Sequence, residues 1–413
     1  MRIGLLVGAL TYFKSFGPVV EAALREQVDV WLLLRDPPEL RQGPKAYLRP
    51  DPAQVPVFAS GAPNVRQWRT DEELVELCVR EQIEVVIAVW LYPRDYGLCR
   101  ALQARGVRWL SLQHGVEHLA MPAQSLLDAD ATAMFAPYWT THARRFFGTD
   151  GLESKLAVTG HPALDALTAI DRHAVRRRHG IPEGKPVVVW LPHDYHDWDL
   201  WEMLAFRRDW RPGFLARALR GRRWDLVPDL FRGVTHARLM RSLREFCDRQ
   251  GACLVVKSRI KDRPARADRE AADMFLFDQA YHPPTILELL AAADLCVHVF
   301  SVAAMEAAAA GVPGLCLVPP RASAFIADPD TAWRRTSDDF LGPETLWNFS
   351  GVAFMLGMQQ AIERLPAMPL DAFRLDASRR AQYLERFVGP VDGQNARRVL
   401  HAAQDLAGAQ VAE

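Results

Sequence analysis

The sequence has 413 residues. That length predicts two domains, because a single hydrophobic core rarely grows beyond about 300 residues. The formal net charge is zero, with 50 Lys and Arg residues against 50 Asp and Glu residues. This balance argues against a nucleic-acid-binding protein, which usually carries a basic excess.

The first part of the chain alternates apolar runs of strand length with helical patterns. The opening run is short and lacks the flanks of an export signal, and no apolar run is long enough to span a bilayer. We therefore expect a cytoplasmic protein. Strands are predicted at 2–8, 28–34, 84–90, 107–112, 132–136 and 155–159, and helices at 17–26, 71–82 and 94–105.

The same alternation resumes after a charged helical pattern at 172–179. Strands are predicted at 186–191, 252–257, 274–277, 294–300 and 314–318, and helices at 235–250, 285–293 and 302–310. Continuous apolar strands that alternate with helices predict parallel sheets covered on both faces. We predict an α/β protein with two Rossmann-like domains facing across a cleft. The expected parts are a first domain at 1–170, a second at 171–375 with an insertion at 198–234, and a helical tail at 376–413 that packs back on the first domain.

Two further patterns exclude classes of protein. The six cysteines fall in helical patterns and apolar strands and form no Cys-x-x-Cys pair, which indicates small core residues in a reducing compartment. Gly4 and Gly8 do not have the spacing of a dinucleotide-binding fingerprint, which argues against a nicotinamide enzyme.

The most informative segment runs from Asp294 to Pro313. It predicts a buried strand, a sharp turn at Ser301 and a short apolar helix that contains Glu306. A helix that begins at the carboxyl end of a parallel strand presents free N–H groups and a positive dipole to a phosphate. Glu306 contradicts its apolar neighbours, so we expect it to have a polar partner such as the hydroxyls of a ribose. The alternative is that Ser301 only caps the helix and Glu306 lies on an exposed face.

Polar residues also follow two strands of the first domain. Lys14 comes after the first strand, close to Ser15, and Gln113, His114 and Gly115 come after strand 107–112. Ligands of open α/β sheets bind beyond the carboxyl ends of strands, so we expect Lys14, Gln113 and Gly115 to contact an acceptor. An imidazole can take a proton from a hydroxyl near neutral pH, which makes His114 the candidate base. The alternative is a structural histidine bonded to the backbone.

The second domain offers cations at the equivalent places. Lys257, Arg259 and Lys261 follow strand 252–257 and suit a diphosphate leaving group, whose charge must be neutralised. The alternative is a solvated basic loop. His193 opens a loop rich in His and Asp, which we expect to contact the donor or acceptor rather than a metal, because loop spacing does not set a tetrahedral geometry. A plain polar loop is the second interpretation.

An insertion at 198–224 combines aromatic rings with positive charge. It contains four Trp residues and seven Arg residues against three acidic residues. Such a composition suits contact with anionic lipid at the inner face of a membrane or with a polyanionic glycan. An insertion that packs on its own domain is the alternative.

Four motifs, in this order, resemble those of a known group. They are Leu112-Gln-His-Gly-Val116, Val158-Thr-Gly-His-Pro-Ala-Leu-Asp165, the Ser301 and Glu306 segment that ends in Gly311-Val-Pro313, and Asp392-Gly-Gln-Asn-Ala-Arg-Arg-Val399. With these motifs the chain resembles the GT-B fold glycosyltransferase superfamily of the surface-polysaccharide type. That group includes UDP-N-acetylglucosamine 2-epimerase-like and CDP-glycerol glycerophosphotransferase-like families. The chain departs from the pattern at His161, where Asn is common, and at 257–261, where the usual sequence is Lys-x-His-Pro.

The resemblance implies a glycosyltransferase of bacterial surface-glycan biosynthesis, such as that of capsule or lipopolysaccharide. It implies a nucleotide-sugar donor, a glycan or lipid-linked acceptor, and no metal or cofactor. The expected donor contacts are His193, Lys257, Arg259, Lys261, Ser301 and Glu306.

Three different functions stay open beside this one. A UDP-sugar 2-epimerase would need acidic residues near the sugar, and Asp95 and Glu117 are the candidates in the first domain. The second is transfer of a polyol phosphate from a CDP-activated donor. The third is a non-catalytic protein that only binds a sugar nucleotide.

Overall fold

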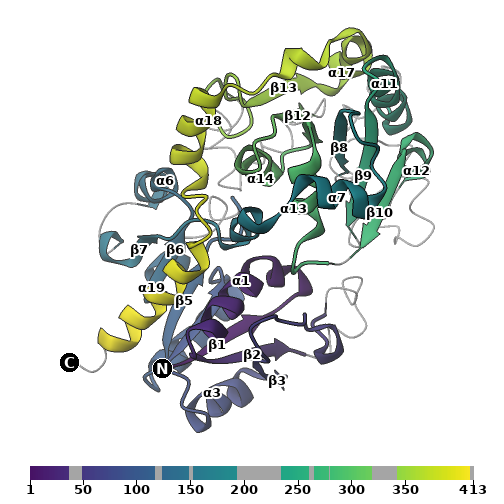
Figure 1. Ribbon diagram of the computed structural model, residues 1–413. Coiled ribbons are helices and arrows are strands. Elements are labelled where there is room, and N and C mark those ends of the chain that lie inside the picture. Colours follow the sequence, from purple (N-terminus) through teal and green to yellow (C-terminus); the bar gives the residue numbers. More distant parts are fainter. Residues whose placement is uncertain are drawn as a thin grey trace, which may run out of the picture. The chain divides into compact units, whose positions relative to one another are not determined.

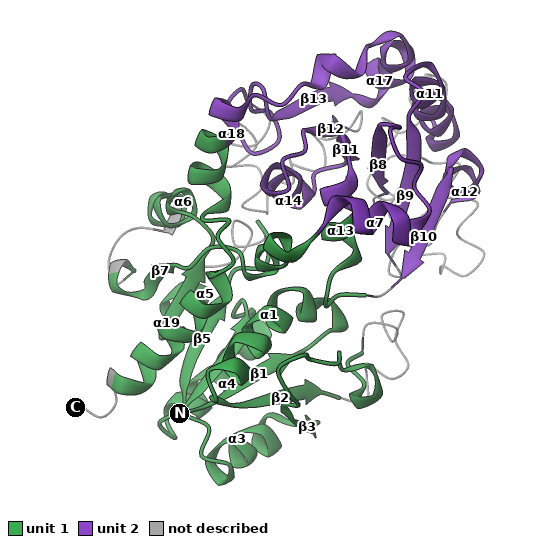
Figure 2. Cartoon of the chain, in the orientation of Figure 1, with its two compact units in different colours: residues 1–170, 279–288, 381–413 green, residues 171–278, 289–380 purple. Residues whose placement is uncertain are grey.

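A computed structural model describes most of the chain, which folds into two compact units (Figure 1 and Figure 2). Unit 1 comprises residues 1–170, 279–288 and 381–413, and unit 2 comprises residues 171–278 and 289–380. The described residues are 1–36, 49–116, 123–147, 152–192, 234–259, 265–278, 280–318 and 342–409.

Unit 1 is built on a seven-stranded parallel sheet with the order β3-β2-β1-β4-β5-β6-β7. Leu5 in the central strand β1 pairs with Leu32 of β2 on one side and with Ile87 of β4 on the other. The strand order reverses between β1 and β4, and such a switch point is where open α/β sheets bind ligands. The strands are β1 (Arg2–Val7), β2 (Asp29–Arg35), β3 (Asn64–Trp68), β4 (Val85–Val89), β5 (Arg108–Leu112), β6 (Ala131–Met134) and β7 (Leu156–Val158).

Helices cover both faces of this sheet. On one face, α3 and α4 pack on a core that includes Leu33, Val86 and Trp109. On the other, the C-terminal helix α19 contacts α1 and the strands β4, β5 and β6 (Figure 1). The helices of unit 1 are α1 (Phe13–Arg25), α3 (Asp71–Arg80), α4 (Tyr96–Gln103), α5 (Gln124–Leu127), α6 (Pro137–Phe147) and α19 (Asn395–Ala409).

Unit 2 is built on a six-stranded parallel sheet with the order β10-β9-β8-β11-β12-β13. Its core joins α11 and α17 to one face of the sheet through side chains such as Phe246, Val256 and Val297. The strands are β8 (Val187–Leu191), β9 (Cys253–Arg259), β10 (Met274–Asp278), β11 (Leu295–His298), β12 (Gly314–Val318) and β13 (Ala353–Gly357), and the helices are α7 (Arg172–His179), α11 (His236–Arg249), α12 (Arg266–Ala271), α14 (Ala303–Ala309) and α17 (Met358–Arg364). Two helices, α13 (Thr285–Ala292) and α18 (Ala377–Tyr383), cross from one unit to the other.

The prediction of an α/β fold with parallel sheets is confirmed, but two edge strands were missed. The side chains of β3 are mostly exposed and polar, so its sequence has no apolar run. Strand β13 is a half-buried edge strand that begins just beyond a stretch of Pro, Ser, Asp and Trp residues. An edge strand buries less surface than a central one, which explains the weak apolar signal of β3. The sequence of β13 is apolar, and only its place after an irregular stretch concealed it.

The first helix begins earlier than its predicted start at 17. A 3-10 turn at Leu10–Tyr12 leads directly into α1, so Lys14 and Ser15 lie in the first turn of that helix. Among the helices of the described residues, none is both long and apolar enough to cross a bilayer.

Candidate active site

His114 lies just beyond the carboxyl end of β5 and contacts residues that follow β1. Its Nδ1 is 3.3 Å from the Ser15 hydroxyl oxygen, and its ring meets that of Tyr12 edge to face with centroids 5.7 Å apart. If Nδ1 carries the hydrogen and donates it to Ser15, Nε2 is left with a lone pair that can accept a proton. The contact with Ser15 therefore suits a general base.

Lys14 and a second histidine, His161, complete this cluster. His161 follows β7, is 1% exposed and stacks on Phe135 with ring centroids 4.2 Å apart. Burial lowers the pKa of His161 well below its ordinary value, and the charges of Lys14 and His114 lower it further. The ring of His161 is therefore neutral at neutral pH, and Lys14 and His114 each lie within electrostatic reach of it.

The Gln113 side chain holds the ends of two strands together. Its Oε1 accepts a hydrogen bond from the Phe135 N–H at 2.8 Å, and its Nε2 donates to the Gly115 carbonyl oxygen at 3.0 Å. The residue is fully buried. These contacts give Gln113 a positioning role beneath His114, while contacts of Gln113 and Gly115 with an acceptor stay a prediction.

The C-terminal helix supports the loop that carries His161. The Asp165 carboxylate accepts hydrogen bonds from the Asn395 N–H at 3.0 Å and the Ala396 N–H at 2.7 Å, at the start of α19. The Asn395 side chain donates to the His161 carbonyl oxygen at 3.2 Å. Gly160 has φ +82°, and a Cβ there would collide with the Asn395 side chain. Two of the motifs that resemble the GT-B group thus contact each other within unit 1.

His161 and Ser15 belong to this cluster but were not among the predicted site residues. The signal for His161 was its place directly after a strand, in the motif that includes Pro162. Ser15 adjoins Lys14 in the sequence, but only the early start of α1 brings the Ser15 side chain to His114 at the end of β5. The contact of Ser15 with His114 and the proximity of His161 to His114 depend on strand order, which a sequence pattern does not contain.

In unit 2, Lys257 is part of a buried ion pair. Its Nζ lies 3.1 Å from the Asp278 carboxylate and donates to the Ser258 carbonyl oxygen at 3.1 Å. The side chain is only 8% exposed. Arg259 is the last residue of the same strand, β9. Lys257 therefore joins β9 to β10, and a contact with a diphosphate stays a prediction for both residues.

Ser301 follows a strained turn at the end of β11. Phe300 has φ +37°, which is unusual for a bulky residue. The Ser301 hydroxyl oxygen accepts a hydrogen bond from the Ala303 N–H at 3.2 Å, and the Ser301 carbonyl oxygen accepts one from the Trp347 indole at 3.0 Å. These bonds hold the sharp turn that the sequence predicts at this position.

Glu306 lies on α14, a helix whose residues are all buried. It is 1% exposed, so the alternative of an exposed position is wrong. Its charge contributes to raising the pKa of the Cys296 thiol, after the larger effect of burial, which places the carboxylate near β11. The Arg380 side chain donates to the Ala308 and Ala309 carbonyl oxygens at the end of the helix. A contact between Glu306 and a ribose stays a prediction.

Several predicted site residues lie outside the described residues. They are His193, Lys261, Glu117 and the Trp- and Arg-rich insertion at 198–224. Within the described ranges, no group of three or more His, Cys, Asp and Glu side chains is arranged to hold a metal ion.

The fold matches solved structures over the whole chain. The wall teichoic acid polymerase TagF, one variant of which was soaked with CDPG, superposes with a TM-score of 0.59 and 10% sequence identity, covering 100% of this chain and 90% of that one. The UDP-GlcNAc 2-epimerase from Neisseria meningitidis, bound to UDP-GlcNAc, gives a TM-score of 0.56 and 11% identity, covering 98% of this chain and 100% of that one. The UDP-GlcNAc 2-epimerase from Methanocaldococcus jannaschii gives 0.54 and 10%, with the same coverage.

These similarities establish a GT-B-like α/β fold, as the sequence motifs predicted. Neither a protein-family model nor a curated protein sequence matches the chain.

Proposed function

We propose that this protein is a glycosyltransferase that moves a sugar from a nucleotide-activated donor to an acceptor hydroxyl in surface-glycan biosynthesis. The observation that carries the proposal is the cluster of Lys14, Ser15, His114 and His161 at the carboxyl ends of the unit 1 strands. In a GT-B-like fold this edge of the first sheet is where polar residues can meet a substrate. The names of the structural neighbours, a polymerase and enzymes that act on UDP-GlcNAc, support a nucleotide-activated substrate.

In the proposed reaction, His114 acts as the base. Ser15 accepts the Nδ1 hydrogen, and Nε2 takes the proton of the acceptor hydroxyl. The oxygen then forms a bond to the anomeric carbon of the sugar while the bond from that carbon to the diphosphate breaks. The electron pair leaves with the nucleoside diphosphate, whose charge is stabilised by Lys257, Arg259 and Lys261 in unit 2.

Unit 2 supplies the nucleotide contacts in this proposal. Ser301 lies at the turn after β11, the strand next to the central β8, and Glu306 lies one turn into α14. The corresponding place in a doubly wound sheet binds nucleotides. His193 is assigned to the donor because it follows β8, and Lys14 to the acceptor because it follows β1.

A polyol-phosphate transferase is the second candidate, favoured by the similarity to TagF and by the CDPG soak of that protein. The same base would serve, because an acceptor hydroxyl must again be deprotonated. A 2-epimerase is favoured by the neighbours of that name. Asp95, an acidic residue that an epimerase could use, follows β4 and forms ion pairs with Arg35 and Arg94.

Labelled donors distinguish these functions. UDP-sugars labelled in the sugar and CDP-glycerol labelled in the glycerol would be incubated with the purified protein, with and without a bacterial cell-envelope extract as acceptor. Glycosyl transfer predicts that sugar label enters polymer only when the extract is present. Transfer of glycerol label indicates the polyol-phosphate reaction, and a new sugar epimer formed without extract indicates an epimerase. Nucleotide binding with none of these products would contradict an enzyme.

A further inference from the structure

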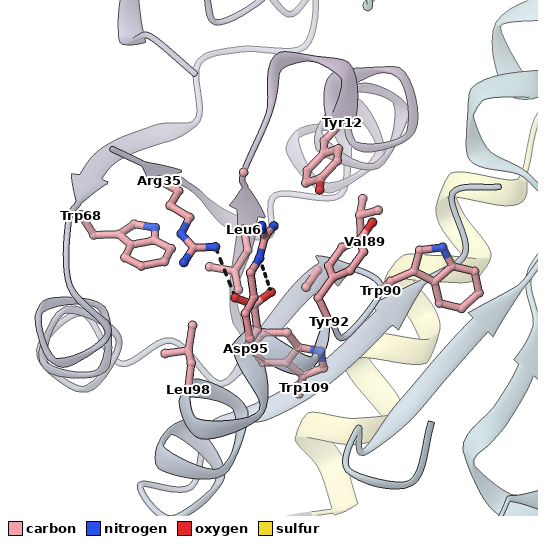
Figure 3. Close-up of a pocket in the computed structure, with 13 residues that line it drawn as sticks. Leu6, Tyr12, Arg35, Trp68, Val89, Trp90, Tyr92, Asp95, Leu98 and Trp109 are labelled. Atoms are coloured by element: carbon pink, nitrogen blue, oxygen red, sulfur yellow. Dashed lines mark hydrogen bonds and ion pairs between the residues drawn. The ribbon is translucent and has the colours of Figure 1, made fainter. Parts of the chain in front are cut away.

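A small cavity in unit 1 lies at the switch point of its sheet. It has a volume of about 30 Å³ and is lined mainly by residues at or just after the carboxyl ends of β1, β2, β3 and β4, with Leu98 of α4 and Trp109 of β5. Aromatic side chains, among them Tyr12, Trp68 and Tyr92, line it together with Arg35 and Asp95 (Figure 3). Arg94 is a third charged residue of the lining. The composition is that of a binding site, with apolar walls and a few convergent polar groups.

Two guanidinium groups share one carboxylate in this cavity. Arg35 Nη1 is 3.3 Å from Asp95 Oδ1, and Arg94 Nε is 3.6 Å from Asp95 Oδ2. Both distances exceed the roughly 2.7–2.9 Å of a strong charge-assisted hydrogen bond. Together the three groups carry a net charge of about +1. Asp95 thus offsets only part of the positive charge.

Arg35 has spare hydrogen-bonding capacity. Its Nε is buried and, among the described residues, has no hydrogen-bond acceptor. A buried N–H without an acceptor costs about 1–3 kcal/mol, so such a group is a place where a ligand oxygen would be favourable. The aromatic rings hold the cations in place: the Arg35 guanidinium lies 5.3 Å from the Trp68 ring centroid, and that of Arg94 lies 5.3 Å from Tyr92.

Backbone strain marks the same cavity. Trp90, one of its lining residues, follows β4 with φ +48°. A bulky residue in this region of the Ramachandran map costs of order 1 kcal/mol or more and persists only where the surrounding structure holds it, as at ligand sites.

Tyr12 connects the cavity to the candidate base. Its side chain lines the cavity, and its ring also packs against the edge of His114 with centroids 5.7 Å apart. In Figure 3 the Tyr12 hydroxyl points toward the other labelled side chains of the cavity. One aromatic ring thus belongs both to the wall of the cavity and to the surroundings of His114.

We propose that this cavity, formed by Arg35, Arg94 and Asp95 among aromatic rings, binds an anionic group, a phosphate or a carboxylate, of the acceptor substrate. A space of this size accommodates a group of a few atoms and is too small for a nucleotide. The positive charge selects an anion over a neutral sugar. Assignment of the anion to the acceptor rests on the proposed function, whereas binding of the anion does not.

Calorimetric titration of the full chain tests the proposal without turnover. Glycerol 3-phosphate and glucuronate are the two anionic probes, and glycerol and glucose are their neutral counterparts. At least one of the two anionic probes is expected to bind. Binding of only one of them would show whether the cavity prefers a phosphate or a carboxylate. Neither neutral compound should bind, and saturating UDP should not displace the anion. Neutral probes that bind as tightly as their anionic counterparts, or displacement by UDP, would overturn the proposal.

Substitutions locate the site. Arg35→Gln and Arg94→Gln should each weaken anion binding about tenfold or more, the scale of one charge-assisted contact. Arg94 is 64% exposed, so Arg94→Gln should fold even if Arg35→Gln does not. Arg100→Gln is the matched control, because Arg100 is similarly exposed and pairs with Asp128 outside the cavity. If the folded Arg94→Gln and Arg35→Gln proteins bind the anion as tightly as the parent protein, the cavity is not the anion-binding site.

The two proposals fail separately. If anion binding follows these expectations but no labelled donor is turned over, the cavity stands and the glycosyltransferase proposal falls. If sugar is transferred but no anionic probe binds, the acceptor is recognised elsewhere and only the cavity proposal falls.

Discussion

The two units share a strand order but use the ends of their strands differently. The order β3-β2-β1-β4-β5-β6 in unit 1 corresponds to β10-β9-β8-β11-β12-β13 in unit 2, and unit 1 adds β7 beyond β6. A bulky aromatic residue with positive φ follows the corresponding strand in each, Trp90 after β4 and Phe300 after β11. In both units the strained backbone therefore lies at the same point of the topology, the turn after the strand beside the switch point.

Beyond those turns the polar residues differ. Unit 1 gathers titratable and hydroxyl side chains, His114, Ser15 and Tyr12, around one imidazole. Unit 2 buries its conspicuous polar residues inside its own structure: Lys257 pairs with Asp278, and Glu306 lies on the buried helix α14 near Cys296. The proposed function assigns the proton transfer to unit 1 and the donor to unit 2, and the predictions below test that assignment.

The largest expected effect concerns the base in unit 1. Replacing His114 with Ala should lower turnover about 10²–10⁴-fold, the usual contribution of a general base, and leave nucleotide affinity unchanged. Steady-state rates with a labelled donor and nucleotide titration would measure the two quantities. His401→Ala, at an exposed position on α19, is the control. Near-normal turnover in a folded His114→Ala protein would return this residue to a structural role.

The reverse pattern is expected for Glu306 in unit 2. Glu306→Ala should weaken nucleotide binding by about 1.5–3 kcal/mol, the scale of hydrogen bonds to a charged group. Glu306→Gln, which keeps the shape of the side chain, should show a smaller loss and guards against misfolding. Titration with UDP and CDP measures both variants. If both fold and bind nucleotide like the parent protein, Glu306 is a structural residue and unit 2 holds the donor by other contacts.

A pH test probes the burial of polar groups in unit 2. His298 is fully buried, both of its ring nitrogens have no hydrogen-bond partner among the described residues, and burial lowers its pKa to about 3. Below its ordinary pKa of about 6.5 the unfolded chain takes up a proton that the folded protein does not. Stability is thus lost as the pH falls, on the order of 2 kcal/mol between pH 7.5 and 5 for this residue.

The melting temperature of the parent protein should fall between pH 7.5 and pH 5. Replacing His298 with Leu should make that fall smaller, by an amount that corresponds to about 2 kcal/mol of stability. Thermal unfolding at both pH values measures the effect, and His401→Leu controls for the loss of an exposed histidine. A fall in the His298→Leu protein equal to that of the parent chain would contradict the assigned pKa direction.

The smallest effect concerns the C-terminal helix of unit 1. Asp165→Ala leaves the Asn395 and Ala396 N–H groups without their acceptor and should lower the stability of unit 1 by about 1–2 kcal/mol, as loss of a helix cap does. Turnover at low temperature should also fall, because the same loop carries His161. Asp392→Ala is a suitable control, since this exposed carboxylate pairs with Arg398 on the same helix. Equal melting temperatures for the Asp165→Ala protein and the parent chain would show that α19 does not depend on this cap.

The sequence by itself determined which segments form the inner strands of both sheets. Runs such as Val85–Val89 and Val187–Leu191 are apolar throughout because a central parallel strand is covered on both faces. The turn at Ser301 was also readable, because a strand, a polar residue and an apolar helix follow one another directly. The edge strand β3 carries no such signal, because exposure allows polar residues there. Strand β13 is apolar but short, and it was missed because it follows an irregular stretch of the sequence.

Only the tertiary structure decided which polar residues meet. Ser15 and His114 are 99 residues apart, and Asp165 and Asn395 are 230 residues apart, so strand order and the return of α19 bring each pair together. A one-dimensional pattern contains the period of each element but not the neighbour of each strand. The cavity around Asp95 shows the same limit. Arg35 ends β2, whereas Arg94 and Asp95 follow β4, and the pairing of Arg35 with Asp95 depends on the places of β2 and β4 in the sheet.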